Sequence, residues 1–291
     1  MSYLNMEEYL SNAIADLMLR AETDLPNDVK NALKKAAISE KGIAKLQLMN
    51  ILKNIELSKN ELRPMCQDTG TPTFFIKVGA DFPYRKIIKD AIINGVRKAT
   101  DKIPLRPNAV DILTGKNSGD NIGKHVPFIH WKIVEGNECI ITAMPKGGGS
   151  ENVSALKMMN PGEGIDGAKK FVLLSVINAG GKPCPPTVVG VGIGGGADIA
   201  MELAKEALLR KVGDRNENEE IALMEEELLE EINSTGIGPM GLGGKTTSLD
   251  VHIEIAHRHP ASFPVAVAMQ CWANRRKTIK IDEGGRIWNI D

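Results

Sequence analysis

Cysteine is scarce in this sequence, with only four among 291 residues. So few cysteines in so long a chain cannot build a disulfide scaffold, which excludes the small secreted classes that depend on one. Aromatic residues are also scarce, at 4%, so the core must consist mainly of aliphatic side chains and methionine. With 42% apolar and 25% charged residues, the rest of the composition is typical of a globular enzyme.

The chain also lacks an excess of either charge, since its net charge is −1. Nothing in its electrostatics therefore favours a nucleic acid or a membrane surface as partner. No apolar run reaches the length of a membrane span, and the start, MSYLNMEEYL, lacks the basic-then-apolar pattern of a signal peptide. We therefore expect a cytoplasmic protein with no membrane and no nucleic-acid partner.

Helical periodicity marks the first sixty residues. Apolar residues recur at helical spacing from Tyr9 to Met18 and again from Leu33 to Ile51, and Pro26 is typical of a helix start. Residues 1–60 are therefore predicted to form a helical layer that covers the core and carries no chemistry.

Beyond residue 60, helices and strands are mixed without strict alternation. PFIHWKIV and ECIITAM are predicted to be neighbouring strands joined by the turn EGN, and the residues after Arg275 are interpreted as a short tail. This mixture predicts an α+β (mixed α/β) fold. We expect one catalytic domain over residues 1–291, with short β-sheets surrounded by helices and its functional core at residues 61–275.

Three of the four cysteines lie in separate polar or glycine-rich loops. Cys66 lies in RPMCQDTGTP, Cys184 between two prolines in GGKPCPPT, and Cys271 after an apolar strand in VAVAMQCWAN. Cys139 instead lies inside the apolar run ECIITAM and is expected to be a buried core residue. Three thiolates from distant loops suit an iron–sulfur cluster with one iron left open for substrate, although each cysteine alone could be a small apolar residue.

Three glycine-rich stretches are candidate anion sites. GVGIGGG follows a predicted strand and precedes a predicted helix, but no acidic residue follows where a dinucleotide ribose would bind. An anion at the helix N-terminus is therefore a better interpretation than a nicotinamide cofactor, and a tight structural turn is the alternative. KGGGSEN and GLGGKTT each add a lysine, Lys146 and Lys245, to backbone N–H groups, and their roles stay open.

Charged side chains in two further segments could act on a carboxylate substrate. Arg106 in PLRPN has the planar fork that binds a carboxylate through two hydrogen bonds. Asp68 could form a proton-transfer pair with a histidine of AHRHP, which contains His257 and His259. The other histidines are expected to be surface or satisfied polar residues: His125, His130 and His252.

Several of these motifs together resemble one known family. CQDTG, KGGGSEN, the Cys184 loop with GIGGG, and TGIGPMGLGGKTT running on to AVAMQCW resemble the α subunit of class I iron–sulfur hydro-lyases. This family contains the oxygen-sensitive fumarate hydratases and the L-tartrate dehydratases. The resemblance extends from about Arg63 to Arg275, and several long motifs in the same order make it specific.

The resemblance implies a role for each matched residue. Cys66, Cys184 and Cys271 would ligate a [4Fe–4S] cluster. Gln67, Asp68, Arg106 and Gly149 would face the dicarboxylate substrate. His259 would pair with Asp68, and these two residues would be catalytic.

Single-chain members of this family carry a further domain that supplies a carbon base and additional substrate contacts. The resemblance therefore implies a separate β subunit that completes the site, in an α2β2 assembly. The expected reaction is reversible hydration of fumarate to L-malate, with L-tartrate dehydration as the alternative. A nicotinamide-dependent oxidoreductase using GIGGG and a zinc-stabilised scaffold without activity are the remaining hypotheses.

Overall fold

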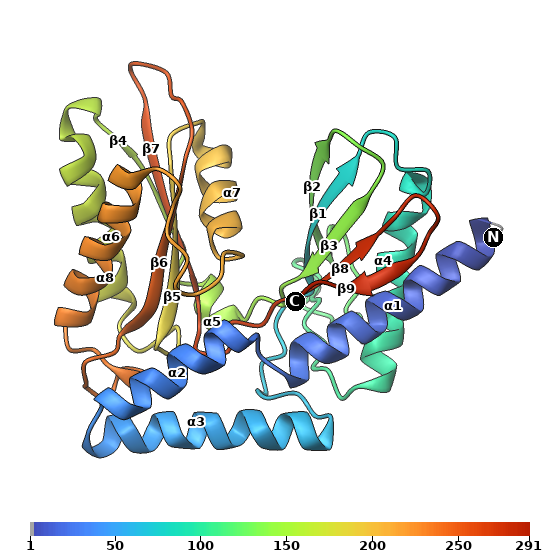
Figure 1. Ribbon diagram of the computed structural model, residues 1–291, viewed down its shortest axis with the longest axis horizontal. Helices are drawn as coiled ribbons and strands as arrows, with labels where there is room; N and C mark the ends of the chain where they lie inside the picture. The colour runs from blue at the N-terminus through green and yellow to red at the C-terminus, as the bar shows by residue number, and fades with distance from the viewer. Residues whose placement is uncertain (1–2) are drawn as a thin grey trace. The chain divides into compact units, whose positions relative to one another are not determined.

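The computed structural model describes residues 3–291, so residues 1 and 2 of the predicted helical layer lie outside the described residues (Figure 1). The chain divides into two compact units. Unit 1 comprises Met1–Pro26, Asn54–Gly147 and Arg275–Asp291, and unit 2 comprises Asn27–Lys53 and Gly148–Asn274. The single domain over residues 1–291 stays a prediction, because compactness alone does not show which parts fold independently.

Both units combine helices with a β-sheet. The helices are α1 (Tyr3–Thr23), α2 (Asn27–Ser39), α3 (Gly42–Glu61), α4 (Arg85–Lys102), α5 (Gly148–Glu151), α6 (Gly164–Ala179), α7 (Ala197–Ala207) and α8 (Glu219–Ser234). The strands are β1 (Thr73–Gly79), β2 (Phe128–Val134), β3 (Cys139–Ala143), β4 (Ala155–Met159), β5 (Thr187–Ile193), β6 (Ser248–Ile255), β7 (Phe263–Gln270), β8 (Lys277–Ile281) and β9 (Ile287–Asn289). This composition confirms the predicted α+β fold with a helical N-terminus.

The sheet of unit 1 has the strand order β2-β1-β3-β8-β9. Helices α1 and α4 pack against each other and contribute one apolar stripe each to the core of this unit. Leu10, Ile14 and Leu17 of α1 recur at helical spacing and are fully buried there. The division between the units falls within α3, and Pro26 directly precedes α2, as predicted.

The prediction that β2 and β3 are neighbours is wrong, because β1 lies between them. Strand β1 pairs in parallel with β2 on one edge and antiparallel with β3 on the other. The connecting loop crosses the end of β1 at Gly79, where a Cβ atom would lie 2.2 Å from the carbonyl oxygen of Gly136. Glycine at position 79 therefore permits a crossing that any side chain would block.

The residues interpreted as a C-terminal tail are part of the sheet of unit 1. β8 pairs antiparallel with β3, and β9 pairs with β8. Ile279 and Ile281 of β8 are buried in the core of this unit. The alternation of buried and half-buried residues along β8 is the pattern of a strand with one buried face.

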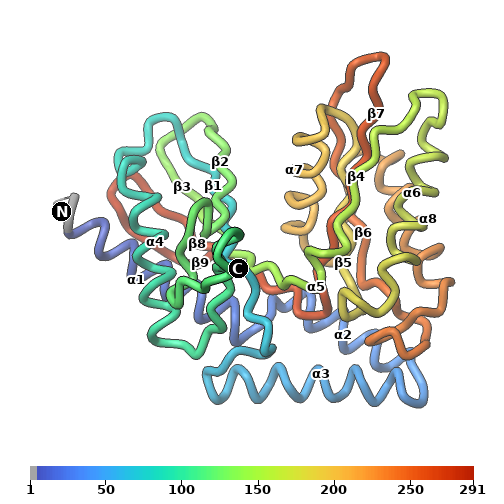
Figure 2. Tube along the Cα trace, turned by 180° about the vertical axis from the view of Figure 1, so that it is seen from behind, coloured from blue at the N-terminus to red at the C-terminus, as the bar shows by residue number. Residues whose placement is uncertain are grey.

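The sheet of unit 2 has the strand order β4-β7-β5-β6 and helices on both faces. Figures 1 and 2 show α7 on one face and α6 and α8 on the other. Every residue of β7 is buried, which explains its continuous apolar run. β5 is parallel to β6 and antiparallel to β7. In the pairing with β7, Val188 lies opposite Gln270.

Glycines of β5 serve helix packing. A Cβ atom at Gly190 would lie 2.1 Å from the carbonyl oxygen of Ala204, and one at Gly192 would lie 1.9 Å from that of Ala200. The backbone of α7 therefore lies directly on β5. These glycines are required for packing, so they no longer argue for an anion or a nicotinamide at this loop.

No helix among residues 3–291 is both long and apolar enough to span a membrane.

Candidate functional site

The CQDTG loop of unit 1 is folded by hydrogen bonds from its own backbone. The N–H of Gly70 donates to Oδ1 of Asp68 at 2.9 Å, so the aspartate closes a tight turn on itself. Cys66 and Asp68 are half-buried, whereas Gln67 is exposed. The turn therefore holds a thiol and a carboxylate at the surface of unit 1.

The loop that carries Arg106 is bonded to this turn. The N–H of Arg106 donates to Oγ1 of Thr69 at 3.1 Å, and Nδ2 of Asn108 donates to the carbonyl oxygen of Gly70 at 2.8 Å. An open cavity of about 670 Å³ is lined by residues of both loops, including Cys66, Gln67 and Arg106. Unit 1 therefore brings together three of the predicted site residues.

The segment that ends with Lys146 and Gly147 is also bonded to the CQDTG loop. The N–H of Thr71 donates to the carbonyl oxygen of Lys146 at 2.9 Å, and the N–H of Lys146 donates back to Thr71 at 3.0 Å. A Cβ atom at Gly147 would lie 3.2 Å from Oδ2 of Asp68. A side chain at position 147 would therefore press against the Asp68 carboxylate, and glycine avoids this contact.

In unit 2, Cys184 and Cys271 lie at the same end of the sheet. Cys271 directly follows Gln270, and Cys184 precedes β5, whose residue Val188 is paired with Gln270. The N–H of Trp272 donates to the carbonyl oxygen of Cys184 at 3.1 Å, which joins the two loops. Cys184 has φ = +55°, a strained conformation for a residue with a side chain.

Two glycine motifs lie at this same end of unit 2. Oγ of Ser150, in α5, donates to Oε1 of Gln270 at 3.5 Å, which places the exposed Gly149 beside the end of β7. In the GLGGKTT segment, a Cβ atom at Gly241 would lie 2.7 Å from the Cα atom of Gly181, in the Cys184 loop. Both motifs therefore border the two cysteines.

Buried amide groups beside Cys271 have unused hydrogen-bonding capacity. Among the described residues, Nε2 of Gln270 and both side-chain polar atoms of Asn274 have no hydrogen-bond partner, although these residues are 1% and 0% exposed. Buried polar groups are nearly always paired, so such donors call for a bound group. Amide N–H groups suit thiolate and sulfide sulfur atoms, so this end of unit 2 fits a sulfur-rich cofactor in its chemistry.

The cysteines differ in their suitability as ligands. None of the four is disulfide-bonded, and Cys66, Cys184 and Cys271 are half-buried. Burial raises the pKa of Cys139 to about 12, so its thiol stays protonated in the core of unit 1, as expected. Among residues 3–291, no group of three or more His, Cys, Asp or Glu side chains forms a metal site.

The structure does not bring His259 to the cysteine end of unit 2. His259 is exposed in the loop between β6 and β7, whereas Cys271 follows the other end of β7. The eight residues of this strand correspond to about 26 Å. Nδ1 of His259 accepts a hydrogen bond from the N–H of Ala261 at 3.1 Å, which leaves Nε2 as its donor.

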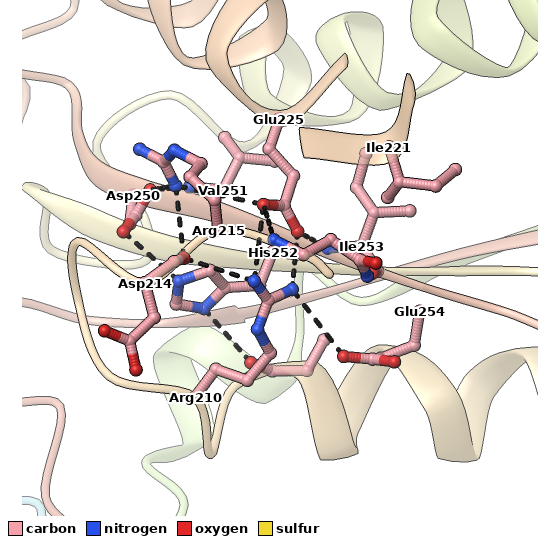
Figure 3. Close-up of polar contacts among 12 residues, drawn as sticks. Arg210, Asp214, Arg215, Ile221, Glu225, Asp250, Val251, His252, Ile253 and Glu254 are labelled. Atoms are coloured by element: carbon pink, nitrogen blue, oxygen red, sulfur yellow. Dashed lines mark hydrogen bonds and ion pairs between the residues drawn. The ribbon is translucent and has the colours of Figure 1, made fainter. Parts of the chain in front are cut away.

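A separate polar cluster in unit 2 is satisfied internally (Figure 3). Glu225 is 0% exposed and accepts hydrogen bonds from Arg210 at 2.5 Å and from the N–H of Ile253 at 2.8 Å. His252, also 0% exposed, lies between Oδ2 of Asp250 and the carbonyl oxygen of Ala207, each 3.1 Å away. Burial is the largest single effect and disfavours the Asp250 charge, but His252, the N–H of Gly213 and Arg215 together lower the pKa of Asp250. The prediction that His252 is a satisfied polar residue is confirmed.

Several residues of the site were missed from the sequence. Thr69 and Asn108 join the CQDTG and PLRPN loops, and Gln270 and Asn274 flank Cys271. The signal for Asn108 was its position two residues after Arg106, within the same polar loop. The signal for Gln270 was its polar side chain at the end of the apolar run FPVAVAMQC, but only the pairing of β5 with β7 brings it beside the Cys184 loop.

Charged and polar side chains on loops of an α+β scaffold, beside half-buried cysteines, are typical of an enzyme. Comparison with known proteins agrees and defines the class. Residues 11–280 match the family model described as fumarate hydratase (fumerase), and the chain belongs to this family of class I hydro-lyases.

Curated relatives cover most of the chain. It is 52% identical to a putative L(+)-tartrate dehydratase subunit alpha of Methanocaldococcus jannaschii, over 94% of this chain and 98% of the relative. It is 38% identical to an L(+)-tartrate dehydratase subunit alpha of Escherichia coli, over 94% and 90%. It is 40% identical to a putative fumarate hydratase class I of Geobacillus stearothermophilus, over 94% of this chain but only 55% of the relative.

Proposed function

We propose that this chain is the α subunit of a two-subunit [4Fe–4S] hydro-lyase that reversibly hydrates fumarate to L-malate in the cytoplasm. The family match supports the hydro-lyase class. Two relatives that match this chain almost end to end are named as α subunits, which supports a separate β subunit. We expect the two kinds of subunit to form an α2β2 assembly. A putative fumarate hydratase relative is nearly twice as long as its region aligned with this chain, which supports an activity that needs a second part in addition to this region.

Dehydration of L-tartrate to oxaloacetate is the second candidate activity. It is favoured by the names of two relatives, at 52% and 38% identity. The two substrates differ by one hydroxyl group, and the residues around Arg106 and Gln67 suit the carboxylate groups that both acids share.

The observation that carries the cluster proposal is the meeting of Cys184 and Cys271 at one end of the unit 2 sheet, beside amide donors that lack partners. With Cys66 they would provide three thiolates to hold the cluster, which when bound would supply an electrophilic iron for the substrate hydroxyl group. The polar residues that line the cavity beside Cys66, among them Gln67 and Arg106, would then bind the substrate.

Protein side chains supply the remaining chemistry. Arg106 binds one carboxylate through its planar fork, and Gln67 donates its amide N–H to the same substrate. The backbone N–H of the exposed Gly149 stabilises negative charge that develops on a carboxylate. Asp68 moves the proton at the substrate hydroxyl oxygen, and the base that removes the proton from carbon comes from the β subunit.

His259 is proposed to pair with Asp68 through its Nε2 donor. Replacement of His259 tests this proposed pair directly. In the assembled enzyme, replacing His259 with asparagine should lower kcat about 100-fold, as expected for loss of a general acid. Cluster content should not change, because His259 is not one of the three proposed cluster ligands. Turnover within threefold of the wild type would remove His259 from the mechanism.

The first experiment is anaerobic co-expression of this chain with its β subunit, followed by assays on fumarate, L-malate and L-tartrate. Brown absorbance together with fumarate hydration, both lost in air, would support the proposal. A brown complex that dehydrates only tartrate would favour the second candidate. A colourless, inactive complex after iron and sulfide reconstitution would refute the cluster.

A further inference from the structure

The site region of unit 1 contains a buried ion pair that no step above uses. Arg275 is 1% exposed, and its Nη1 donates to Oε2 of Glu22 at 2.7 Å. The same Nη1 donates to the backbone carbonyl oxygen of Asp68 at 3.0 Å. One buried guanidinium therefore connects α1 to the residue proposed to move the substrate proton.

Glu22 contacts the CQDTG loop in a second way. Its backbone carbonyl oxygen accepts a hydrogen bond from the N–H of Met65 at 3.0 Å, one residue before Cys66. Its side chain is 0% exposed and reaches Asp68 through Arg275. The loop is therefore held by Glu22 on both sides of Cys66 and Gln67.

The guanidinium also lies close to the Asp68 side chain. A Cβ atom at Gly147 would be 3.2 Å from Oδ2 of Asp68 and 3.7 Å from Nη2 of Arg275. Both groups therefore line the same small space above Gly147. A shift of Arg275 would therefore move the Asp68 backbone carbonyl that it holds and change the space beside the Asp68 carboxylate.

We infer that Glu22 and Arg275 are positioning residues that set the orientation of Asp68 for proton transfer. This inference rests on the proposed function. Glu22 fixes the guanidinium, and the guanidinium fixes the Asp68 carbonyl and limits where its carboxylate can lie. A charged pair does this better than a neutral one, since hydrogen bonds between ionised partners are about twice as strong.

Burial of this pair disfavours the charged form of Glu22. Burial, helped by the nearby Asp68 charge, raises the pKa of Glu22 to about 7 despite the opposing effect of Arg275. A buried ion pair is rarely the most stable filling of such a space, which favours a role in positioning over one in folding. Above pH 7 the pair is ionised and holds the loop most firmly.

The test uses Glu22→Gln in the assembled, cluster-loaded enzyme at pH 8. Glutamine keeps the shape and one acceptor but loses the charge. We expect kcat to fall about 10-fold with KM changed less than threefold. Cluster content and melting temperature should stay close to wild type. Arg275→Lys, which keeps the charge but loses the planar fork, should lower kcat more while the protein still folds.

Hydrogen exchange gives a readout that does not need turnover. In Glu22→Gln, amides of the peptide over residues 64–71 should exchange faster, because this peptide contains the N–H groups of Met65 and Gly70. Peptides from β6 should not change. If the wild-type complex is inactive on all three acids but this exchange difference is present, the proposed function fails while the positioning role stands.

Glu225→Gln is the matched control, because Glu225 is an equally buried glutamate paired with an arginine, Arg210, in unit 2. Its kcat per cluster should equal that of the wild type. Glu22→Gln with wild-type kcat and unchanged exchange at residues 64–71 would overturn the inference. An equal loss of kcat in Glu225→Gln would do so as well, because the effect would then belong to any buried pair.

Discussion

Individual cysteines occupy contrasting surroundings in this protein, and their replacement should have opposite effects. Cys184→Ser should abolish the brown absorbance and the activity, because it removes a proposed ligand from a half-buried loop. Cys139→Ser should keep both but lower the melting temperature, because it places a hydroxyl group in the apolar core. Iron content, absorbance and thermal unfolding of the two purified variants check this. Loss of the cluster in Cys139→Ser alone would reverse the assignment.

The Asp68 side chain is separable from the fold of its loop. Asp68→Asn should keep the bond to the Gly70 N–H through the amide oxygen, so the cluster should stay bound while kcat falls at least about 100-fold. Steady-state kinetics on cluster-loaded enzyme measure this. Asp120→Asn is the control, because Oδ1 of Asp120 accepts the N–H of Ile122 in the same kind of turn. Full activity in Asp68→Asn would remove the proposed proton transfer.

The raised pKa of Glu22 predicts a pH-dependent stability. Because the pKa of Glu22 rises from 4.5 to about 7 on folding, ionising it inside the protein costs folding free energy. The free energy of unfolding is therefore highest below pH 4.5 and falls as the pH rises through 7, although the ionised pair still orders the loop locally. Glutamine does not titrate, so the melting temperature of the wild type relative to Glu22→Gln should fall between these values and then level off. Thermal unfolding of both proteins across this range is the measurement. A constant difference would contradict the pKa shift.

At the level of elements, the contact between β5 and α7 depends on the absence of a side chain. Gly192→Ala would place a Cβ atom 1.9 Å from the Ala200 carbonyl oxygen. We expect a loss of about 3 kcal/mol in the free energy of unfolding, since overpacking of this kind forces the backbone apart. Gly162→Ala, whose Cβ would meet nothing within 4 Å, should change stability by less than about 0.5 kcal/mol. Chemical denaturation of both variants compares them.

Elements whose burial pattern is local were predictable from the sequence, and their partners were not. The helices predicted within residues 1–60 and the apolar strand predicted before Cys271 each have the expected periodicity. The position of β1 between β2 and β3 depends on a backbone crossing at Gly79. The pattern of apolar residues along the sequence does not predict such a crossing. Strand β8 was missed because its short run, followed by Asp and Gly residues, looks like a tail until β3 provides an edge.

The candidate site was predictable residue by residue but not as an arrangement. Motifs identify Gln67, Asp68 and Arg106 by type, and the structure brings them onto two bonded loops of unit 1. Neither Glu22 nor Arg275 could be found this way. The two residues are 253 positions apart in the sequence, and only the fold brings them together. The position of His259 at the opposite end of β7 from Cys271 is likewise a property of the sheet.

For the whole molecule, activity should depend on assembly. The purified chain, loaded with its cluster, should turn over about 100-fold more slowly than the complex, because the proposed carbon base lies on the β subunit. Titrating the β subunit into the chain should raise the rate to a plateau at a fixed stoichiometry. Full turnover by the chain alone would exclude the two-subunit proposal.

The strand order of unit 1 also dictates when this protein can finish folding during synthesis. The inner edge of β8 completes β3, and the side chain of Asp291 bonds both Arg20 of α1 and the N–H of Thr278 in β8. Since β8 follows β3 only after residues 148–274 of unit 2, β3 must wait with an unpaired edge while that part of the chain emerges from the ribosome. An open edge is a template for aggregation. A nascent chain arrested before residue 277 should therefore be the form that chaperones bind most.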